Sequence, residues 1–363
     1  MLIQENVPLA PLTTFQIGGP ARYFSEARTP EEVKASAAFA RSRNLPLFVL
    51  GGGSNLLVSD AGWPGLVLKV GILGINHVHG HNRVLFEAGA GEDWDGFVAA
   101  TVAHGMGGIE CLSGIPGSVG GTPVQNVGAY GQEAADVIES VQVLDLENGE
   151  LVELSKEDCG FRYRSSIFNT TQRGRYVILQ VSFALQHGAT PHLEYADLKS
   201  YFAGWTVAPN LLQTREAVLQ IRASKGMLST GTDQDSRSAG SFFKNPVVSA
   251  EVHQELSRRA TARGLQIPSY PALEFQHKIS AAWLVEHSGF SRGLARGAVG
   301  ISNKHALAIV NRGGATAAEV IVLMKEIQQQ VESQWGIRLE PEPVFVGDFT
   351  TRAFPHPSGL KQS

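Results

Sequence analysis

Ten consecutive residues, Gly114 to Pro123, contain four glycines and two prolines. Glycine permits positive φ and has no Cβ, so successive backbone N–H groups can approach one anion closely. The prolines restrict the same stretch, which favours a rigid loop over a flexible linker. The sequence therefore predicts a loop with bare backbone that can hold a diphosphate group, and a tight surface turn is the alternative.

A second glycine-rich loop supports the diphosphate interpretation. The apolar run Leu47 to Leu50 is expected to be a strand, and it leads directly into Gly51-Gly52-Gly53-Ser54-Asn55. A strand that ends in a glycine loop is a recurrent phosphate-binding arrangement. The sequence contains neither G-x-G-x-x-G nor G-x-x-x-x-G-K-[ST], which disfavours a Rossmann or P-loop fold. G-x-S-x-G is also absent, so a hydrolase nucleophile elbow has no support.

Length and charge limit the class of protein. At 363 residues the chain exceeds the size at which one hydrophobic core keeps growing, so two or three domains are expected. The formal net charge of −4 gives no reason to expect nucleic acid or an anionic membrane as a partner. No segment has the pattern of a signal peptide or a membrane span. We therefore expect a cytoplasmic protein without nucleic-acid or membrane partners. A monomer is also expected, although length and charge do not show it.

Three polar segments carry side chains suited to chemistry. Phe161 to Ser166 places two arginines beside a tyrosine, and an arginine can clamp a carboxylate through two hydrogen bonds. Ser238 to Pro246 contains serines, paired phenylalanines, a lysine and an asparagine. Leu339 to Pro343 holds two glutamates between prolines. Each segment taken alone could equally be an exposed turn, and spacing does not show that the three converge.

The histidines His77, His79 and His81 alternate, as zinc ligands on one face of a strand do. Gly80 and Asn82 indicate a turn at the same place, and no carboxylate or thiol accompanies the histidines. The two cysteines have no C-x-x-C spacing. We therefore expect no metal.

Local signals mark several elements. Thr29-Pro30-Glu31-Glu32 predicts a helix start, and Asn148-Gly149 between apolar runs predicts a hairpin. Thr316 and Glu319 form a capping-box pattern ahead of an apolar stripe that continues to Trp335. Strands are expected to dominate the middle of the chain, whereas helices are expected in the last third.

Taken together, these segments resemble the UDP-N-acetylenolpyruvoylglucosamine reductase (MurB) family. The resemblance runs from about Leu12 to Glu342, and its most specific blocks are Leu50 to Asn55, Gly114 to Ser118 with Gln125 to Gly131, Tyr163-Arg164, and Gly240 to Pro246. It implies an α+β fold with a two-part FAD-binding region of the vanillyl-alcohol-oxidase (PCMH) type followed by an α/β substrate-binding domain. The implied boundaries are 1–70 and 71–213 for the FAD-binding parts, with a substrate-capping loop near 190–200, then 214–347 for the substrate domain and 348–363 for a flexible tail.

The resemblance also implies an activity. Members of the family use NADPH and FAD to reduce the enolpyruvyl group of UDP-N-acetylglucosamine enolpyruvate to UDP-N-acetylmuramate, a precursor of peptidoglycan. FAD is thus the implied cofactor and NADPH the co-substrate, with ping-pong kinetics. By the same resemblance Arg164 clamps the substrate carboxylate, Ser241 donates the proton, and Glu342 helps to stabilise the developing anion.

Binding residues are assigned by the same resemblance. Two positions depart from the family pattern: Pro343 follows Glu342 where a β-branched residue is common, and His287 stands where a glutamine is expected. The alternatives are an FAD-linked oxidase or dehydrogenase of the same fold and a noncatalytic flavin or nucleotide-sugar sensor. The residues implied to contact FAD are Gly51, Gly52, Gly53, Ser54, Asn55, Gly114, Ile115, Pro116, Gly117, Ser118 and Asn126, and those implied to contact the substrate are Tyr130, Tyr163, Tyr195, Lys225, Asn245 and His287.

Overall fold

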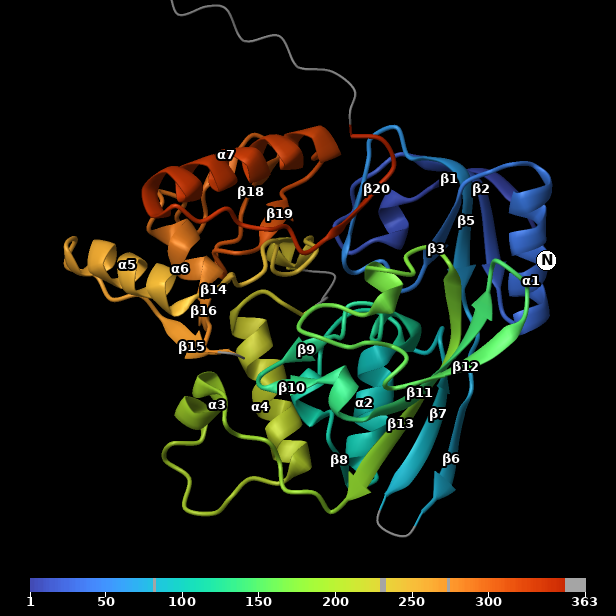
Figure 1. The fold of residues 1–363 in the computed structure, drawn as a ribbon, viewed down its shortest axis with the longest axis horizontal. Helices are drawn as coiled ribbons and strands as arrows, with labels where there is room; N and C mark the ends of the chain where they lie inside the picture. The colour runs from blue at the N-terminus through green and yellow to red at the C-terminus, as the bar shows by residue number, and fades with distance from the viewer. Residues whose placement is uncertain (81–82, 229–232, 273–274, 350–363) are drawn as a thin grey trace, which may run out of the picture.

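The computed structural model describes residues 1–80, 83–228, 233–272 and 275–349. The chain forms three groups of helices and strands (Figure 1). Residues from all three groups line one cavity. No helix within the described ranges is long and apolar enough to cross a membrane. The predicted tail lies outside the described residues from Thr350 onward.

The first group is a four-stranded sheet with the order β1-β2-β5-β3, in which only β1 runs antiparallel to its neighbour. α1 begins as predicted, because the Thr29 side chain accepts a hydrogen bond from the Glu32 N–H and Pro30 is the first helical residue. β3 is the strand expected before the Gly51 loop. The bounds are β1 Gln4–Pro8, β2 Pro20–Ala27, α1 Pro30–Ser42, β3 Leu47–Leu50, β4 Leu56–Val58 and β5 Trp63–Val70.

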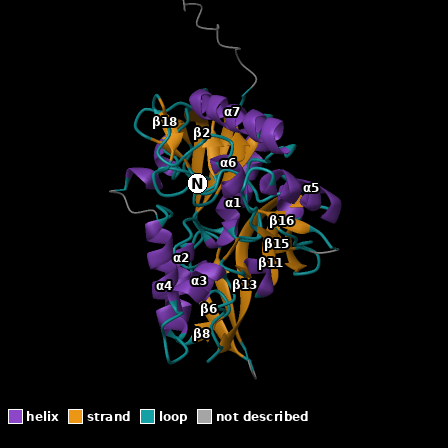
Figure 2. Ribbon diagram, turned by 90° about the vertical axis from the view of Figure 1, so that its left-hand side faces the viewer, coloured by secondary structure: helices purple, strands orange, loops and turns teal. Residues whose placement is uncertain are grey.

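The second group is an antiparallel sheet with the order β12-β11-β13-β7-β6, and β8 also pairs with β13. α2 packs against this sheet (Figure 2), and its Phe97 ring lies 5.1 Å from the ring of Phe183 on β13. The predicted hairpin joins β11 to β12 through Gly149, whose φ of 79° favours glycine. The bounds are β6 Ile75–His79, β7 Val84–Gly89, α2 Trp94–Ala103, β8 Met106–Gly107, β9 Gly128–Ala129, β10 Gln132–Glu133, β11 Ile138–Asp145, β12 Leu151–Ser155, β13 Tyr176–His187, α3 Ala196–Tyr201 and α4 Leu211–Ser224.

The third group combines three helices with short strands. The predicted capping box of Thr316 and Glu319 is present at the start of α7. The predicted apolar stripe is core, because Val320, Leu323 and Ile327 are each at most 1% exposed. The bounds are β14 Val247–Val248, α5 Ala250–Thr261, β15 Ser269–Pro271, β16 His277–Ile279, α6 Ala281–Glu286, β17 Ala295–Arg296, β18 Val299–Ile301, β19 Ile309–Asn311 and α7 Ala317–Trp335.

The last strand, β20 (Val344–Val346), returns to the beginning of the chain. It pairs in parallel with β4, with Val344 opposite Leu56 and Val346 opposite Val58. Figure 1 shows this red strand beside the blue N-terminal elements. The pairing carries the preceding Glu342 to the end of the Gly51–Asn55 loop, since the Val344 N–H donates to the Asn55 carbonyl (2.9 Å).

A single carboxylate joins the N-terminal segment to α7. Asp60 accepts hydrogen bonds from the N–H groups of Ala317 (2.7 Å) and Ala318 (3.0 Å). These are two of the N–H groups that a helix leaves without partners in its first turn. We expect Asp60→Ala to lower the free energy of unfolding by about 1–2 kcal/mol, measured by denaturant titration. The control is Glu157→Ala, an exposed carboxylate that caps no helix, which should change stability by less than about 0.5 kcal/mol.

Candidate active site

The two predicted glycine loops meet face to face. A Cβ on Gly52 would lie 2.4 Å from the Cα of Gly117, and a Cβ on Gly51 would lie 2.9 Å from the Ser118 Oγ. Real Cβ atoms do not approach other heavy atoms as closely as 2.4 Å, so the contact at Gly52 has no room for a side chain. Glycine is therefore needed in these loops because two backbones touch.

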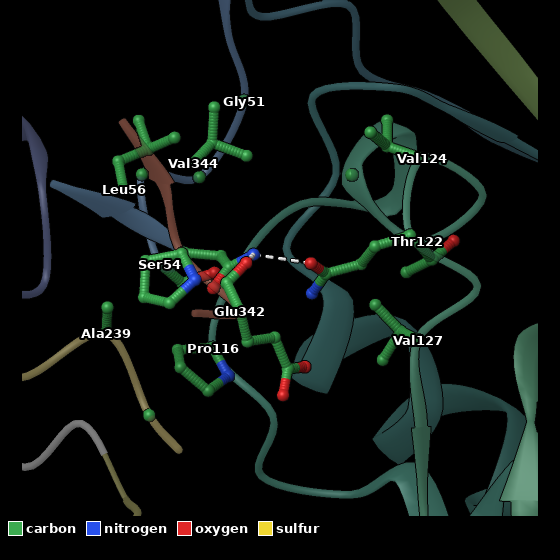
Figure 3. A pocket seen from close by; sticks show the side chains of 18 of the residues that line it. Gly51, Ser54, Leu56, Pro116, Thr122, Val124, Val127, Ala239, Glu342 and Val344 are labelled. Carbon is green, nitrogen blue, oxygen red and sulfur yellow. Dashed lines mark hydrogen bonds between the residues drawn. The ribbon is translucent and has the colours of Figure 1, made fainter. Parts of the chain in front are cut away.

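A cavity of about 900 Å³ lies against these loops. Figure 3 shows the Glu342 side chain among Pro116, Ser54 and Val127, which come from separate segments of the chain. The three segments that sequence spacing could not bring together all reach this cavity. Its lining includes the predicted site residues Gly51, Gly52, Gly53, Ser54, Asn55, Ile115, Pro116, Gly117, Ser118, Tyr163, Arg164, Ser241, Asn245 and Glu342.

The loops present hydrogen-bond donors that the described protein leaves unused. The N–H groups of Gly52, Gly53 and Ser54 donate to no protein acceptor within the described ranges, and the same holds for Gly117 and Ser118. The Ser118 Oγ is buried and also has no partner there. Of these residues Gly53 and Ser118 are buried, and buried donors without acceptors are rare in folded proteins. This donor set fits the diphosphate of a dinucleotide cofactor.

Gly114 has a different place in its loop. Its N–H donates to Asp95 Oδ1 (2.6 Å), and its carbonyl accepts from Arg222 Nε (3.1 Å). Burial alone would raise the pKa of Asp95, but hydrogen bonds from Arg215 and Gly114 outweigh it and hold that pKa below its ordinary value. Gly114 therefore anchors the loop to α2 and α4, and it does not line the main cavity.

Asn126 was predicted to contact the cofactor, but its side chain is engaged within the protein. Its Nδ2 donates to Glu133 Oε2 (2.7 Å), and its Oδ1 accepts from the Ala135 N–H (3.0 Å). The Asn126 carbonyl accepts from Arg164 Nη1 (3.5 Å), and the Gly128 carbonyl accepts from Nη2 (2.7 Å). The structure thus places Asn126 behind the site, where it orients Arg164.

Arg164 and Glu342 form an ion pair in the cavity wall. Arg164 Nε lies 3.0 Å from Glu342 Oε1, with the two side chains 20% and 14% exposed. The Nε–H does not point at the carboxylate, so this buried donor makes no hydrogen bond within the described protein. Burial raises the pKa of Glu342, and the opposing effects of Arg164 and Lys244 are smaller. The site therefore holds an arginine 3.0 Å from a carboxyl group whose pKa burial raises.

The backbone fixes Ser241 next to Glu342. The Glu342 N–H donates to the Phe242 carbonyl (2.9 Å), and Phe243 forms a β-bridge with Pro341. Asn55 Nδ2 holds the Glu342 carbonyl from the other side (3.3 Å). These contacts therefore hold Glu342 in position although Pro343 follows it. The Ser241 hydroxyl lines the cavity and has no hydrogen-bond partner among the described residues.

Three of the predicted substrate residues form a cluster outside the lining of this cavity. The rings of Tyr130 and Tyr195 meet edge to face with centroids 5.4 Å apart, and Lys225 Nζ lies 5.7 Å from the Tyr130 centroid. Lys225 Nζ is 2.6 Å from Asp197 Oδ2. α4 links this cluster to the cavity, because Arg222 on the same helix lines the cavity wall.

Two histidines, the predicted contact His287 and the unpredicted His305, have different surroundings. The predicted contact His287 stacks on Trp283 with centroids 4.1 Å apart, bonds the Trp283 carbonyl through Nδ1 (2.8 Å), and does not line the cavity. The sequence reasoning did not consider His305. Burial lowers the pKa of His305 to about 4, and the charges of Lys225 and Arg292 act in the same direction. His305 lies near Lys225 because of the tertiary fold, and no local sequence pattern indicates this proximity.

The histidines considered as metal ligands show no such arrangement. His77 and His79 lie on the exposed edge strand β6, and His81 is outside the described residues. Within the ranges that the structure describes, no three His, Cys, Asp or Glu side chains gather as metal ligands.

Comparisons with known proteins match most of the chain. A family model described as an FAD binding domain matches residues 21–155, and one described as UDP-N-acetylenolpyruvoylglucosamine reductase, C-terminal domain, matches residues 232–346. The UDP-N-acetylenolpyruvoylglucosamine reductase of Nocardia farcinica is 45% identical over 95% of this chain and 90% of its own length. The corresponding protein of Thermobifida fusca is 43% identical over 94% of this chain and 98% of its own.

Similarity extends to a solved structure. The crystal structure of UDP-N-acetylenolpyruvylglucosamine reductase (MurB) from Thermus caldophilus is 27% identical in sequence and has a TM-score of 0.65. The match covers 95% of this chain and 100% of that one.

The contact between the loops gives a steric prediction. We expect Gly52→Ala to separate the loops, because its Cβ would collide with Gly117, and to reduce the FAD bound per protein chain at least tenfold. The measurement is the flavin absorbance of the purified protein, with and without added FAD. Gly204→Ala is the matched control, since nothing lies within 4 Å of its Cβ position and its φ is not in the left-handed region. Full FAD content in Gly52→Ala would contradict the prediction.

Proposed function

Because this chain belongs to the UDP-N-acetylenolpyruvoylglucosamine reductase (MurB) family, we propose that its cavity is the active site and that Arg164, Ser241 and Glu342 act there. The predicted family, α+β fold and FAD cofactor are confirmed. The protein is an FAD-dependent oxidoreductase that reduces UDP-N-acetylglucosamine enolpyruvate to UDP-N-acetylmuramate for peptidoglycan precursor synthesis. The residue roles below are our proposal.

One observation carries the proposal: a partly buried arginine lies 3.0 Å from a partly buried carboxyl group, and both line the same cavity as the Ser241 hydroxyl. Arg164 would hold the substrate carboxylate, since its charge is permanent and its donors can form two parallel hydrogen bonds. The carboxylate is where negative charge accumulates when the neighbouring double bond is reduced. Arg164 would therefore bind more tightly as the reaction proceeds, which lowers the barrier.

The two remaining groups handle a proton and a developing charge. When bound and reduced by NADPH, FAD would supply a hydride for the terminal carbon of the enolpyruvyl group. Ser241 Oγ would then give its proton to the carbon next to the carboxylate, which completes the lactyl group. Glu342 would help to stabilise the developing anion in its proton-bearing form, which burial favours because it raises the pKa of this carboxyl group.

Other residues are assigned to binding. Gly51 to Asn55 and Ile115 to Ser118 would contact FAD, and the N–H groups of Gly52, Gly53, Ser54, Gly117 and Ser118 would hold its diphosphate. Tyr163, Asn245 and the cluster of Tyr130, Tyr195 and Lys225 would meet the UDP-sugar. The boundaries 1–70, 71–213 and 214–347, the monomeric state and the cytoplasmic location are part of the same proposal. Nucleic acid has no part in it.

The proton donor can be tested by separating the two half-reactions. We expect Ser241→Ala to slow reoxidation of the reduced flavin by the enolpyruvyl substrate by about 10² to 10⁴, because a positioned proton donor is lost. Reduction of the flavin by NADPH should keep its rate. Both rates are measured by anaerobic stopped-flow absorbance. Ser333→Ala, an exposed serine on α7, is the control and should leave both unchanged. Equal slowing of the two half-reactions in Ser241→Ala would rule out the proposed role.

Glu342 gives a pH prediction. A raised pKa means that the carboxyl keeps its proton to a higher pH than an ordinary glutamate, and that the neutral donor is lost as pH rises through this pKa. We expect the rate of flavin reoxidation by substrate to fall across that range. Glu342→Gln keeps a neutral donor, so its rate should be lower by about 10-fold to 10³-fold and free of this pH step. An unchanged pH profile in Glu342→Gln would show that the step belongs to another group.

A further inference from the structure

Lys225 differs from the other proposed substrate contacts because a carboxylate already occupies its ammonium group. Lys225 Nζ lies 2.6 Å from Asp197 Oδ2, and the two side chains are 30% and 36% exposed. Water reaches both groups, so the pair can open without leaving a charge stranded in the interior. An anion that competes for Lys225 must replace Asp197 or share the lysine with it.

The pair connects two elements that carry the proposed substrate contacts. Asp197 lies in the first turn of α3, two residues after Tyr195, and Lys225 is the C-terminal cap of α4. The Tyr195 ring lies against Tyr130, and Lys225 lies over the face of the same Tyr130 ring. The ion pair therefore ties the segment that begins at Tyr195 to the helix that borders the cavity.

Packing holds α3 in place without the ion pair. Leu198 is completely buried and Phe202 is 8% exposed, and both belong to one cluster with Ala217 and Val218 of α4. This apolar contact makes Asp197 dispensable for folding, because burying side chains of this size stabilises a docked helix far more than a half-exposed ion pair does. Stabilisation of α3 therefore does not explain why position 197 carries a carboxylate.

The negative charge of Asp197 is unfavourable for an anionic ligand that binds in this cluster. Arg222 on α4 is 8% exposed and gives its hydrogen bonds to the carbonyls of Gly114 and Met227, so it stays fixed to the cofactor loop. His305 is neutral at neutral pH, because burial lowers its pKa to about 4. Arg292, the other cation that acts on His305, pairs with Glu286 (2.8 Å). Lys225 is the cation that pairs with Asp197, and Asp197 is a carboxylate that would repel a phosphate placed there.

We propose that Asp197 is an affinity-determining residue, whose carboxylate occupies Lys225 until the diphosphate of a UDP nucleotide replaces it. The inference rests on the proposed function in one respect, the contact between Lys225 and the diphosphate. Because the nucleotide must break the ion pair of Asp197 and Lys225 when it binds, its binding free energy is less favourable by the free energy of that pair. The exchange also separates Asp197 from Lys225 whenever a nucleotide is bound, which releases one restraint on the Tyr195 segment. Weak binding of the shared nucleotide part favours product release over tight ground-state binding.

The test is the affinity of the FAD-loaded enzyme for UDP, measured by isothermal titration calorimetry. Asp197→Asn keeps the size of the side chain and removes its charge, so we expect UDP to bind about three- to tenfold more tightly. Asp197→Ala should change the affinity in the same direction. Glu194→Gln is the matched control, because Glu194 is an exposed carboxylate of the same segment that pairs with Lys199, and its change should leave the Kd within about twofold.

A double-mutant cycle identifies the partner. Lys225→Met should weaken UDP binding, and adding Asp197→Asn to it should no longer tighten binding, because the exchange needs the lysine. If Asp197→Asn weakens UDP binding or leaves it unchanged, Asp197 orients Lys225 for the ligand or is irrelevant, and the inference is overturned. If Asp197→Asn tightens binding equally in both backgrounds, simple repulsion accounts for the effect and the exchange is refuted. If Lys225→Met binds UDP like the unmodified enzyme, the proposed contact of Lys225 fails as well.

Discussion

Parallel pairing of β20 with β4 is the constraint on which the active site depends. It joins residues near the two ends of the described chain and places Glu342 at the mouth of the Gly51–Asn55 loop. From there Glu342 pairs through its own N–H with the Ser241 segment and through its carboxylate with Arg164. Three parts of the chain therefore meet at one residue, Glu342. A backbone hydrogen bond to Phe242 and the Asn55 side chain hold Glu342 from two sides, and side-chain hydrogen bonds to the carbonyls of Asn126 and Gly128 hold Arg164.

The site also contains features that local rules disfavour. Asn126, Tyr130 and Arg164 adopt positive φ, with values of 45°, 49° and 53°. Such conformations cost free energy in residues with a Cβ, and the surrounding contacts must enforce them. The hydrogen bonds of Arg164 to the carbonyls of Asn126 and Gly128 supply one such restraint. Three of the seven non-glycine residues with positive φ in the described ranges thus lie in or behind the candidate site, where a fold can give up some stability for function.

Much of the fold followed from local patterns. The start of α1 at Pro30, the hairpin at Gly149 and the capping box of Thr316 lie where the sequence predicts them, because each depends on residues within one turn of the backbone. The candidate site was predictable through its motifs and family resemblance. The side chains of Asn126 and His287 are hydrogen-bonded within the protein, and a motif does not say whether a side chain faces a ligand or supports a neighbour.

The sequence by itself determined the two glycine loops, the periodicity of the helices and the identity of the chemical groups. These properties depend on which residues are neighbours in the chain, or on backbone freedom that glycine alone provides. Only the tertiary structure decided that Arg164, Ser241 and Glu342 share one cavity, that Asp197 holds Lys225, and which donors remain free. Those properties depend on burial and on contacts between residues far apart in the chain, and no local pattern encodes them.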